Sequence, residues 1–241
     1  MDHWYDTHAH LDRYAPAELD SILARAAEAE VRVIGVGTDL ESSEALLAVK
    51  GLAGVTVGIH PASGKSGSDQ RLSEVAARRG VCAIGECGFD AEGPPWELQA
   101  AVFRAQVRVA RESGLAVVVH VDGEGSWEQL ASQAELLEDL RVIRHYFTGD
   151  DAQAAWHAER RHYISFGNPL RRDRSLRDIA REYPEDRLLI ETDSYPLPGR
   201  NTEPAHVVKV GETLALLRDW TFAYARERLG ANTRAAFNLP G

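Results

Sequence analysis

The chain of 241 residues has few cysteines, and their spacing argues against a disulfide. Cys82 and Cys87 lie five residues apart in an apolar run that predicts a strand, which would separate them by about 16 Å. That separation is too large for a mutual disulfide. Unpaired thiols are typical of a reducing compartment, so we expect a cytoplasmic protein in which both cysteines are buried packing residues.

Positive charge is also scarce. The 27 Lys and Arg residues face 37 Asp and Glu residues, and the net charge of −10 gives no long-range attraction to nucleic acid or to a membrane surface. No apolar run approaches the roughly 20 residues of a transmembrane helix. The first residues, MDHWYD, contain neither a basic region nor an apolar stretch, so we expect no signal peptide. We also expect no membrane partner, and we take a monomer as the default.

What the chain does have is a regular alternation of short apolar runs with segments of helical composition. Most runs are apolar almost throughout, as in strands that are buried on both faces. Eight such strands in a chain of this length predict a single (β/α)8 TIM barrel domain over residues 1–241, with a doubly wound open sheet as the alternative. The runs lie at 4–10, 31–38, 55–61, 81–90, 115–122, 141–149, 162–169 and 187–196.

Two helical segments carry specific expectations. In residues 95–114 apolar side chains recur every three to four positions, which predicts one buried face, and Gly114 is a plausible end of the helix. Residues 208–237 are expected to form one or two closing helices. The predicted buried face of the first segment consists of Leu98, Val102, Ala105 and Val109.

Side chains that can bind metals stand at the carboxyl ends of most of the predicted strands. Because side chains two residues apart share a strand face, His8 and His10 point the same way, and so do Glu191 and Asp193. In a barrel these strand ends converge on one face. Imidazole and carboxylate ligands suit divalent metals such as Zn, Mn or Mg. The strand-end residues are His8, His10, His60, Glu86, His120, His145, Glu191 and Asp193.

The remaining histidines and the charge runs fit no such pattern. We interpret the runs at 77–80, 158–162 and 170–178 as solvated faces, although the last follows the seventh strand and would border the active face. The histidines interpreted as surface or structural residues are His3, His157, His162 and His206.

An ordered set of motifs resembles a known family. They are DTHAHLD at 6–12, GIHP at 58–61, GECGFD at 85–90, the helix with Gln99, Phe103 and Gln106, VVVHVD at 117–122, HYFTG at 145–149, LLIETDSYPL at 188–197, RNTEP at 200–204 and the segment 232–237. In this order the chain resembles the TatD-type metal-dependent deoxyribonucleases of the amidohydrolase-like barrels. No single motif is decisive, but the set is specific and covers nearly the whole chain.

The resemblance implies two divalent metal ions, Zn, Mg or Mn, and hydrolysis of DNA phosphodiester bonds, with exonuclease action on single-stranded DNA. The first ion would be held by His8, His10, Glu86 and Asp193. The second would be held by Glu86, His120 and His145, with Glu86 as the shared ligand. His60 would lie at the mouth of the barrel and contact the substrate phosphate.

The expected mechanism uses water activated by the metals. Glu86 and Asp193 are the expected catalytic carboxylates, and Asp193 would accept the proton of the water as general base. His60 and Arg200 would neutralise a non-bridging phosphate oxygen. Glu191 would orient a metal-binding imidazole; the alternative is a buried acid that pairs with a Lys or Arg.

Some positions depart from the family pattern. Asp122 stands where an Arg is common, which weakens the expected phosphate contact and leaves open a hydrolase of a small amide, ester, lactone or phosphoester. A metal-stabilised binding protein without activity is a third alternative. Ala9 and Tyr146 stand where Cys is common. Aromatic residues in the loops after the strands would either stack on bases or pack the loops; they are Phe89, Tyr146, Phe147 and Tyr195.

Overall fold

The computed structural model describes residues 2–63, 69–196 and 202–240. Its strands lie within the apolar runs predicted from the sequence, except that β3 begins one residue earlier, at Gly54. They form one eight-stranded sheet in the order β1 to β8, and every recorded pairing is parallel. The strands are β1 (Trp4–Ala9), β2 (Val31–Val36), β3 (Gly54–Val57), β4 (Val81–Asp90), β5 (Ala116–Asp122), β6 (Val142–Arg144), β7 (Tyr163–Phe166) and β8 (Leu188–Ile190).

Helices separate consecutive strands, and two helices follow β8, as expected for residues 208–237. Within the described ranges no helix has the length and apolar character that a membrane crossing requires. The helices are α1 (Pro16–Glu28), α2 (Leu40–Leu46), α3 (Asp69–Ala76), α4 (Trp96–Ser113), α5 (Ser126–Ser132), α6 (Asp151–Glu159), α7 (Arg174–Glu182), α8 (Val207–Leu217) and α9 (Phe222–Phe237).

The chain divides into two compact units, one of residues 1–35, 51–53 and 145–241 and one of residues 36–50 and 54–144. In the first unit β1 pairs with β2, and Ala9 at its end forms a parallel bridge with Ser194, just after β8. The His10 N–H donates to the Ser194 carbonyl oxygen at 2.9 Å. Pairing of the first strand with the end of the last one belongs to a closed (β/α)8 barrel and excludes the open sheet.

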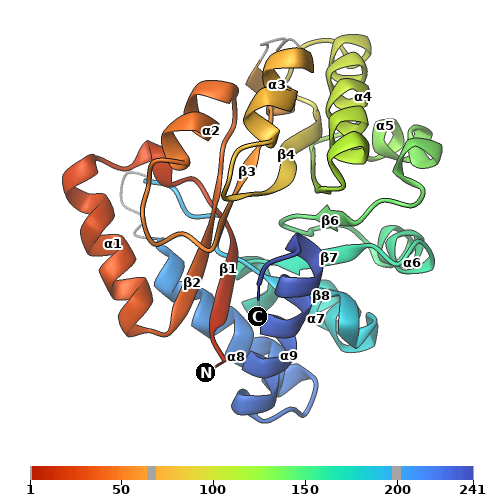
Figure 1. Cartoon of the computed structure of the whole chain (residues 1–241). Helices are drawn as coiled ribbons and strands as arrows, with labels where there is room; N and C mark the ends of the chain where they lie inside the picture. Colours follow the sequence, from red (N-terminus) through yellow and green to blue (C-terminus); the bar gives the residue numbers. More distant parts are fainter. Residues whose placement is uncertain (1, 64–68, 197–201, 241) are drawn as a thin grey trace. The chain divides into compact units, whose positions relative to one another are not determined.

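The last two helices cover β1 within this unit, and Figure 1 shows α8 and α9 beside that strand. All six residues of β1 are buried. Gly211 of α8 lies against Trp4, since a Cβ at Gly211 would come 2.4 Å from Cζ3 of the indole ring. The missing side chain lets α8 approach the strand closely, which keeps β1 and its histidines in a fixed position.

The predicted apolar face of α4 is confirmed only at Val109, which is buried, and is wrong at Leu98, which is 58% exposed. Val102 and Ala105 are partly exposed, whereas Gln99, Phe103 and Gln106 are buried. Each glutamine amide hydrogen bonds to backbone: Gln106 accepts from the Ile59 N–H at 2.7 Å and donates to the Ile59 carbonyl at 3.0 Å. An amide whose hydrogen bonds are all made can be buried at little cost. The face of α4 that carries Gln99 and Gln106 therefore points to the interior, in place of the face predicted by hydropathy.

Two local predictions are confirmed. Gly114 ends α4 in the left-handed conformation, with φ of 65°, which glycine adopts at little cost. Cys82 and Cys87 are both free and buried. Burial raises the pKa of the Cys82 thiol to about 12 and that of Cys87 even further, so both side chains are neutral packing groups.

Candidate metal centre

The end of β1 and the residues after β8 bring three potential metal ligands together in the first unit. Asp193 Oδ1 lies 3.3 Å from His10 Nε2 and 3.9 Å from His8 Nε2. One ligand atom from each of the three residues lies within 4.8 Å of the others. The backbone makes this possible, because the Asp193 N–H donates to the His8 carbonyl at 3.0 Å and ties the two segments together.

These distances fit a divalent cation. Two ligands that bind one tetrahedral ion at about 2.0–2.1 Å are separated by about 3.3–3.4 Å. The His10 Nε2 to Asp193 Oδ1 distance is 3.3 Å. Asp193 Oδ1 is buried and makes no hydrogen bond of acceptable geometry within the described residues, which leaves its lone pairs available for a metal.

Asp193 has an unusual backbone and a strongly acidic side chain. Its φ of 50° lies in the left-handed region, which Asp and Asn tolerate better than most residues. Burial favours the neutral acid and raises its pKa, but contact with His10 and the charges of His8 and His145 outweigh this effect and lower the pKa to about 2. The carboxylate is therefore ionised at neutral pH.

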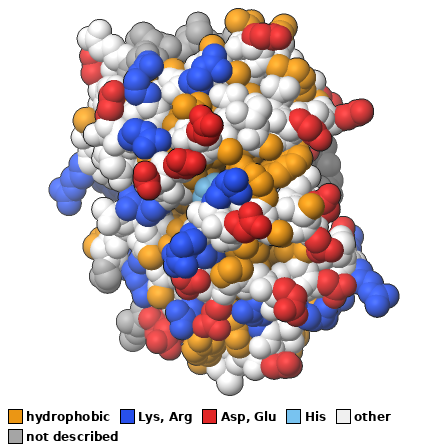
Figure 2. Space-filling view, turned by 90° about the vertical axis from the view of Figure 1, so that its right-hand side faces the viewer, with side chains coloured by type: hydrophobic (Ala, Val, Ile, Leu, Met, Phe, Trp, Pro, Cys, Tyr) orange, Lys and Arg blue, Asp and Glu red, His pale blue; other side chains and the backbone are white. Residues whose placement is uncertain are grey.

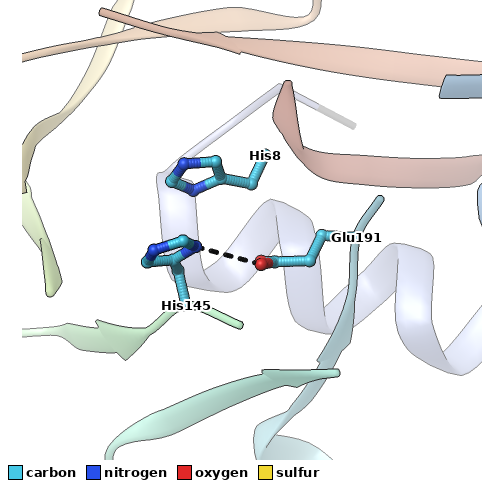
Figure 3. A group of neighbouring side chains, drawn as sticks. All are labelled: His8, His145 and Glu191. Carbon is cyan, nitrogen blue, oxygen red and sulfur yellow. Dashed lines mark hydrogen bonds and ion pairs between the residues drawn. The ribbon is translucent and has the colours of Figure 1, made fainter. Parts of the chain in front are cut away.

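His145 lies against His8 in the same unit. The two imidazole rings stack with centroids 3.9 Å apart and planes 16° from parallel. Figure 3 shows that Glu191 approaches His145 from the side of Nδ1, and the distance from Nδ1 to Glu191 Oε1 is 3.1 Å. The same oxygen accepts from the Tyr146 N–H at 2.7 Å. Glu191 thus fixes both the ring of His145 and the backbone that follows it.

Asp6 is a buried acid for which the sequence pattern supplied no role. It accepts from the Thr192 N–H at 2.8 Å, from the Thr192 hydroxyl at 2.5 Å and from the His8 N–H at 3.3 Å. Burial raises the pKa of Asp6 to about 8, although the hydrogen bonds from Thr192 oppose the shift. Asp6 therefore connects β1 to the residue before Asp193. Its shared strand face with His8 was the one available sequence signal.

The second unit contains its own group of imidazoles and carboxylates. His120, at the end of β5, lies between two acids: its Nδ1 is 2.6 Å from Glu86 Oε1 and its Nε2 is 3.2 Å from Asp90 Oδ2. His60 lies beside them, with Nε2 at 3.6 Å from Glu86 Oε1 and its ring centroid 4.4 Å from that of His120. One ligand atom each of His60, Asp90 and His120 lies within 4.8 Å of the others.

Asp90 is the candidate site residue that sequence reasoning missed in this unit. The pKa of Asp90 is lowered, chiefly by its hydrogen bond with His120, even though partial burial opposes the shift. The backbone of Asp90 is fixed by Gln99, whose amide accepts from its N–H at 2.9 Å and donates to its carbonyl at 2.9 Å. Glu86 and Asp90 are four residues apart in β4, and this even spacing could have identified Asp90.

The other predicted site residues divide into three cases. Phe89 and Phe147 are buried and pack the interior. The predicted loop position of Phe89 is wrong, because Phe89 lies within β4. Tyr146 and Tyr195 are partly exposed. Arg200 falls outside the described residues. The role of Glu86 as a ligand shared by two ions stays a prediction.

Comparison with known proteins agrees with this geometry. The family model of the TatD related DNases matches residues 5–238. A Bacillus subtilis protein named as an uncharacterized metal-dependent hydrolase, YabD, is 30% identical, and the alignment covers 98% of this chain and 99% of the relative. A Shigella flexneri protein named 3'-5' ssDNA/RNA exonuclease TatD is also 30% identical, with 91% of this chain and 93% of the relative covered.

Solved structures support the same assignment. The crystal structure of YjjV, a TatD homologue from Escherichia coli, superposes with a TM-score of 0.87 at 27% identity and covers 98% of both chains. A TatD family hydrolase from Entamoeba histolytica has a TM-score of 0.82 at 17% identity, which supports the fold alone. With a family model that spans almost its entire length, the chain belongs to the family of TatD related DNases.

Proposed function

We propose that the protein is a metal-dependent hydrolase that cleaves phosphodiester bonds, with single-stranded DNA as its substrate. The observation that carries the proposal is the convergence of His8, His10 and Asp193, with Asp193 Oδ1 3.3 Å from His10 Nε2. Family membership supports the hydrolytic chemistry, and relatives named as exonucleases support the substrate class.

The chain's residues would share the work as follows. His8, His10 and Asp193 would hold one divalent ion, Zn, Mg or Mn, while Glu86, His120 and His145 are the further proposed ligands. When bound, such ions polarise water and the phosphoryl oxygens. Asp193, which is ionised at neutral pH, would accept a proton, and Glu191 would hold His145 in place.

His60 is proposed to contact the scissile phosphate. Its side chain is 19% exposed, in contrast to the almost fully buried carboxylate of Glu86 beside it. It can therefore reach a ligand in solvent while staying next to the metal-binding groups. Arg200, the other residue expected to contact phosphate, stays a proposal from the sequence.

The charge distribution predicts a mode of DNA binding. On the face drawn in Figure 2, Lys and Arg side chains alternate with Asp and Glu side chains. The chain as a whole carries a net charge of −10. Attraction for DNA would then come mainly from the metal centre and its immediate surroundings. Affinity should depend less steeply on salt than in proteins with an extended basic surface.

The test of the proposed function is hydrolysis of single-stranded DNA labelled at the 5′ or 3′ end. Purified protein would be assayed with Mg, Mn or Zn separately and with EDTA. His145→Ala serves as the site variant and His3→Ala, outside both groups, as the matched control. We expect metal-dependent shortening that is lost in His145→Ala and retained in His3→Ala, and the labelled end reports the direction of cleavage.

A second candidate function is supported by Asp122, which is exposed at the end of β5 where an Arg is common in the family. A carboxylate there repels a polyanion and suits a smaller substrate. Absence of DNA cleavage by metal-loaded protein, together with turnover of a small ester, lactone or phosphoester, would contradict the DNase proposal and favour this candidate.

A further inference from the structure

A polar pocket lies beside His145, in the same unit as His8 and Asp193. It has a volume of about 290 Å³, and none of the described residues that line it is acidic. Two of its cations, Arg171 and Arg172, belong to the charge run at 170–178 and come just after β7; a third, Lys209, comes from the start of α8. Three cations thus gather in one concavity of a chain whose net charge is −10.

The cations of this pocket keep their charge uncompensated. Arg171, Arg172 and Lys209 form no ion pair with any acid in the described part of the chain. The nearby carboxylate of Glu203 is already bound by Arg25, with Nη2 to Oε2 at 2.6 Å. Like charges brought together in this way repel one another, so an anion bound in the pocket would relieve that repulsion.

His206 lies on the pocket wall, close to these cations. The pKa of His206 is lowered, first by its partial burial. Lys209, Arg25 and Arg171 add to the shift, and Glu203 opposes it. The electrostatic influence of two of the pocket cations therefore reaches the same side chain, as expected if they point into a common space.

Tyr146 joins the pocket to the metal-binding residues. Its ring lines the pocket, and its centroid lies 6.3 Å from that of His145, the preceding residue. The ring lies over Gly167, where a Cβ would come 2.5 Å from the Tyr146 Cε2 atom. The backbone of Tyr146 is held by Glu191. A ligand in the pocket would therefore contact a side chain whose position is fixed by the same carboxylate that holds His145.

We propose that this pocket binds a phosphate group of the substrate strand next to the one that is hydrolysed, an inference that rests on the proposed function. Guanidinium groups bind phosphate oxygens through paired N–H donors, and an ammonium group adds a point charge. Asn168, which also lines the pocket, offers a neutral amide donor. The pocket would make the enzyme favour a strand with several phosphates over a compound with one phosphodiester bond.

The first test measures binding without catalysis. A fluorescent oligothymidylate is titrated in EDTA at several NaCl concentrations against wild type, the double variant Arg171→Gln/Arg172→Gln, and the control Arg174→Gln. Arg174 belongs to the same charge run and is exposed at the start of α7, outside the pocket. We expect the double variant to raise Kd roughly tenfold and to flatten the salt slope by about 0.7 for each lost contact. Equal Kd values and slopes for the double variant and the control would overturn the proposal.

The second test uses turnover with Mn on an oligonucleotide and on bis(p-nitrophenyl) phosphate, which has one phosphodiester bond. The double variant should lose much more kcat/KM on the oligonucleotide, mainly through KM. The phosphate in the pocket could be a terminal phosphate or an internal phosphodiester of the strand. Oligonucleotides with and without a terminal phosphate distinguish these two sources. An effect confined to those with a terminal phosphate would overturn the assignment to a neighbouring phosphodiester. Failure of wild type on both substrates would refute the proposed function, while the binding data would still decide the role of the pocket.

Discussion

Asp193, the proposed proton acceptor, has an environment that is built by contacts distant in sequence. It is ionised at neutral pH, its Oδ1 atom faces two imidazoles, and its backbone is fixed by the N–H bond to His8. None of these properties is local in sequence, because the partners lie at the other end of the chain. The chemistry of this residue is therefore a product of the pairing between β1 and the segment after β8.

Asp193→Asn should lower turnover by roughly 100-fold or more, since an amide cannot accept the proton and binds metal weakly. Asn tolerates the left-handed φ of 50° as well as Asp does, so strain does not confound the result. Activity on labelled DNA and the circular dichroism spectrum would be measured together. Near-normal turnover by a folded variant would contradict the general-base assignment.

Glu191→Gln should lower metal affinity by roughly 10- to 100-fold, the usual cost of losing the partner of a metal-binding imidazole. Gln keeps an acceptor for the Tyr146 N–H but removes the negative charge that faces His145 Nδ1. Metal content after dialysis against a chelator is the measurement, with exposed Glu182→Gln as the matched control. Unchanged metal content would exclude a positioning role for Glu191.

The residue scale also shows what strand periodicity could and could not predict. Alternation along a strand correctly placed His8 beside His10, because a strand's two faces follow directly from its backbone. It allowed Asp90 to share the face of Glu86 in β4, but the contact of Asp90 with His120 depends on the register between β4 and β5. A single sequence does not specify that register, so the acid was missed.

At the scale of elements, α4 holds the backbone of two segments in place, the one before His60 and the end of β4. Gln106 binds both backbone groups of Ile59, next to His60, and Gln99 binds both backbone groups of Asp90. These two amides, two helical turns apart on the same face of α4, thereby fix the backbone at Asp90 and beside His60, the two residues that lie next to His120. Hydropathy could not predict this, since it classifies both glutamines as surface residues.

Gln106→Leu should lower the free energy of unfolding by about 2–4 kcal/mol, because it leaves the buried N–H and carbonyl of Ile59 without partners. Urea denaturation is the measurement, and Gln70→Leu, at an exposed position of α3, is the matched control. A loss equal to that of the control would show that water or a local shift satisfies Ile59 and that the hydrogen bonds from Gln106 contribute little.

At the scale of the whole molecule, the overall architecture was the most predictable property. Strands buried on both faces read as apolar runs, and parallel strands need helices between them, so the order of the runs already specified a (β/α)8 arrangement. The boundaries were less exact. The run at 187–196 holds a strand of only three residues, Leu188–Ile190, because the following residues turn to present Glu191 and Asp193.

Whole-molecule stability should depend on pH through the buried pair of His157 and His162, whose Nδ1 atoms lie 3.0 Å apart. Burial lowers the pKa of His162 to about 4, from about 6.5 in the unfolded chain. Between these values the unfolded chain binds a proton that the folded one does not. Stability should therefore fall by about 3 kcal/mol as pH drops from 6.5 to 4.

The measurement is the free energy of unfolding by urea at several pH values for wild type and His162→Gln. The variant should be less stable near neutral pH. Its free energy of unfolding should fall less steeply with decreasing pH, by a slope that corresponds to about one proton. Parallel curves for the two proteins would contradict the assignment of this pH dependence to His162.

The bridge between Ala9 and Ser194 has a consequence for how the protein is made. His8 and His10 leave the ribosome well before His145, Glu191 and Asp193, which lie far downstream in the sequence. The candidate metal centre of this unit is thus incomplete in every nascent chain that ends before the residues that follow β8. A nascent chain that ends before Asp193 would carry His8 and His10 without the carboxylate that completes the proposed metal site, so metal binding at this site would become possible only once Asp193 has been synthesised.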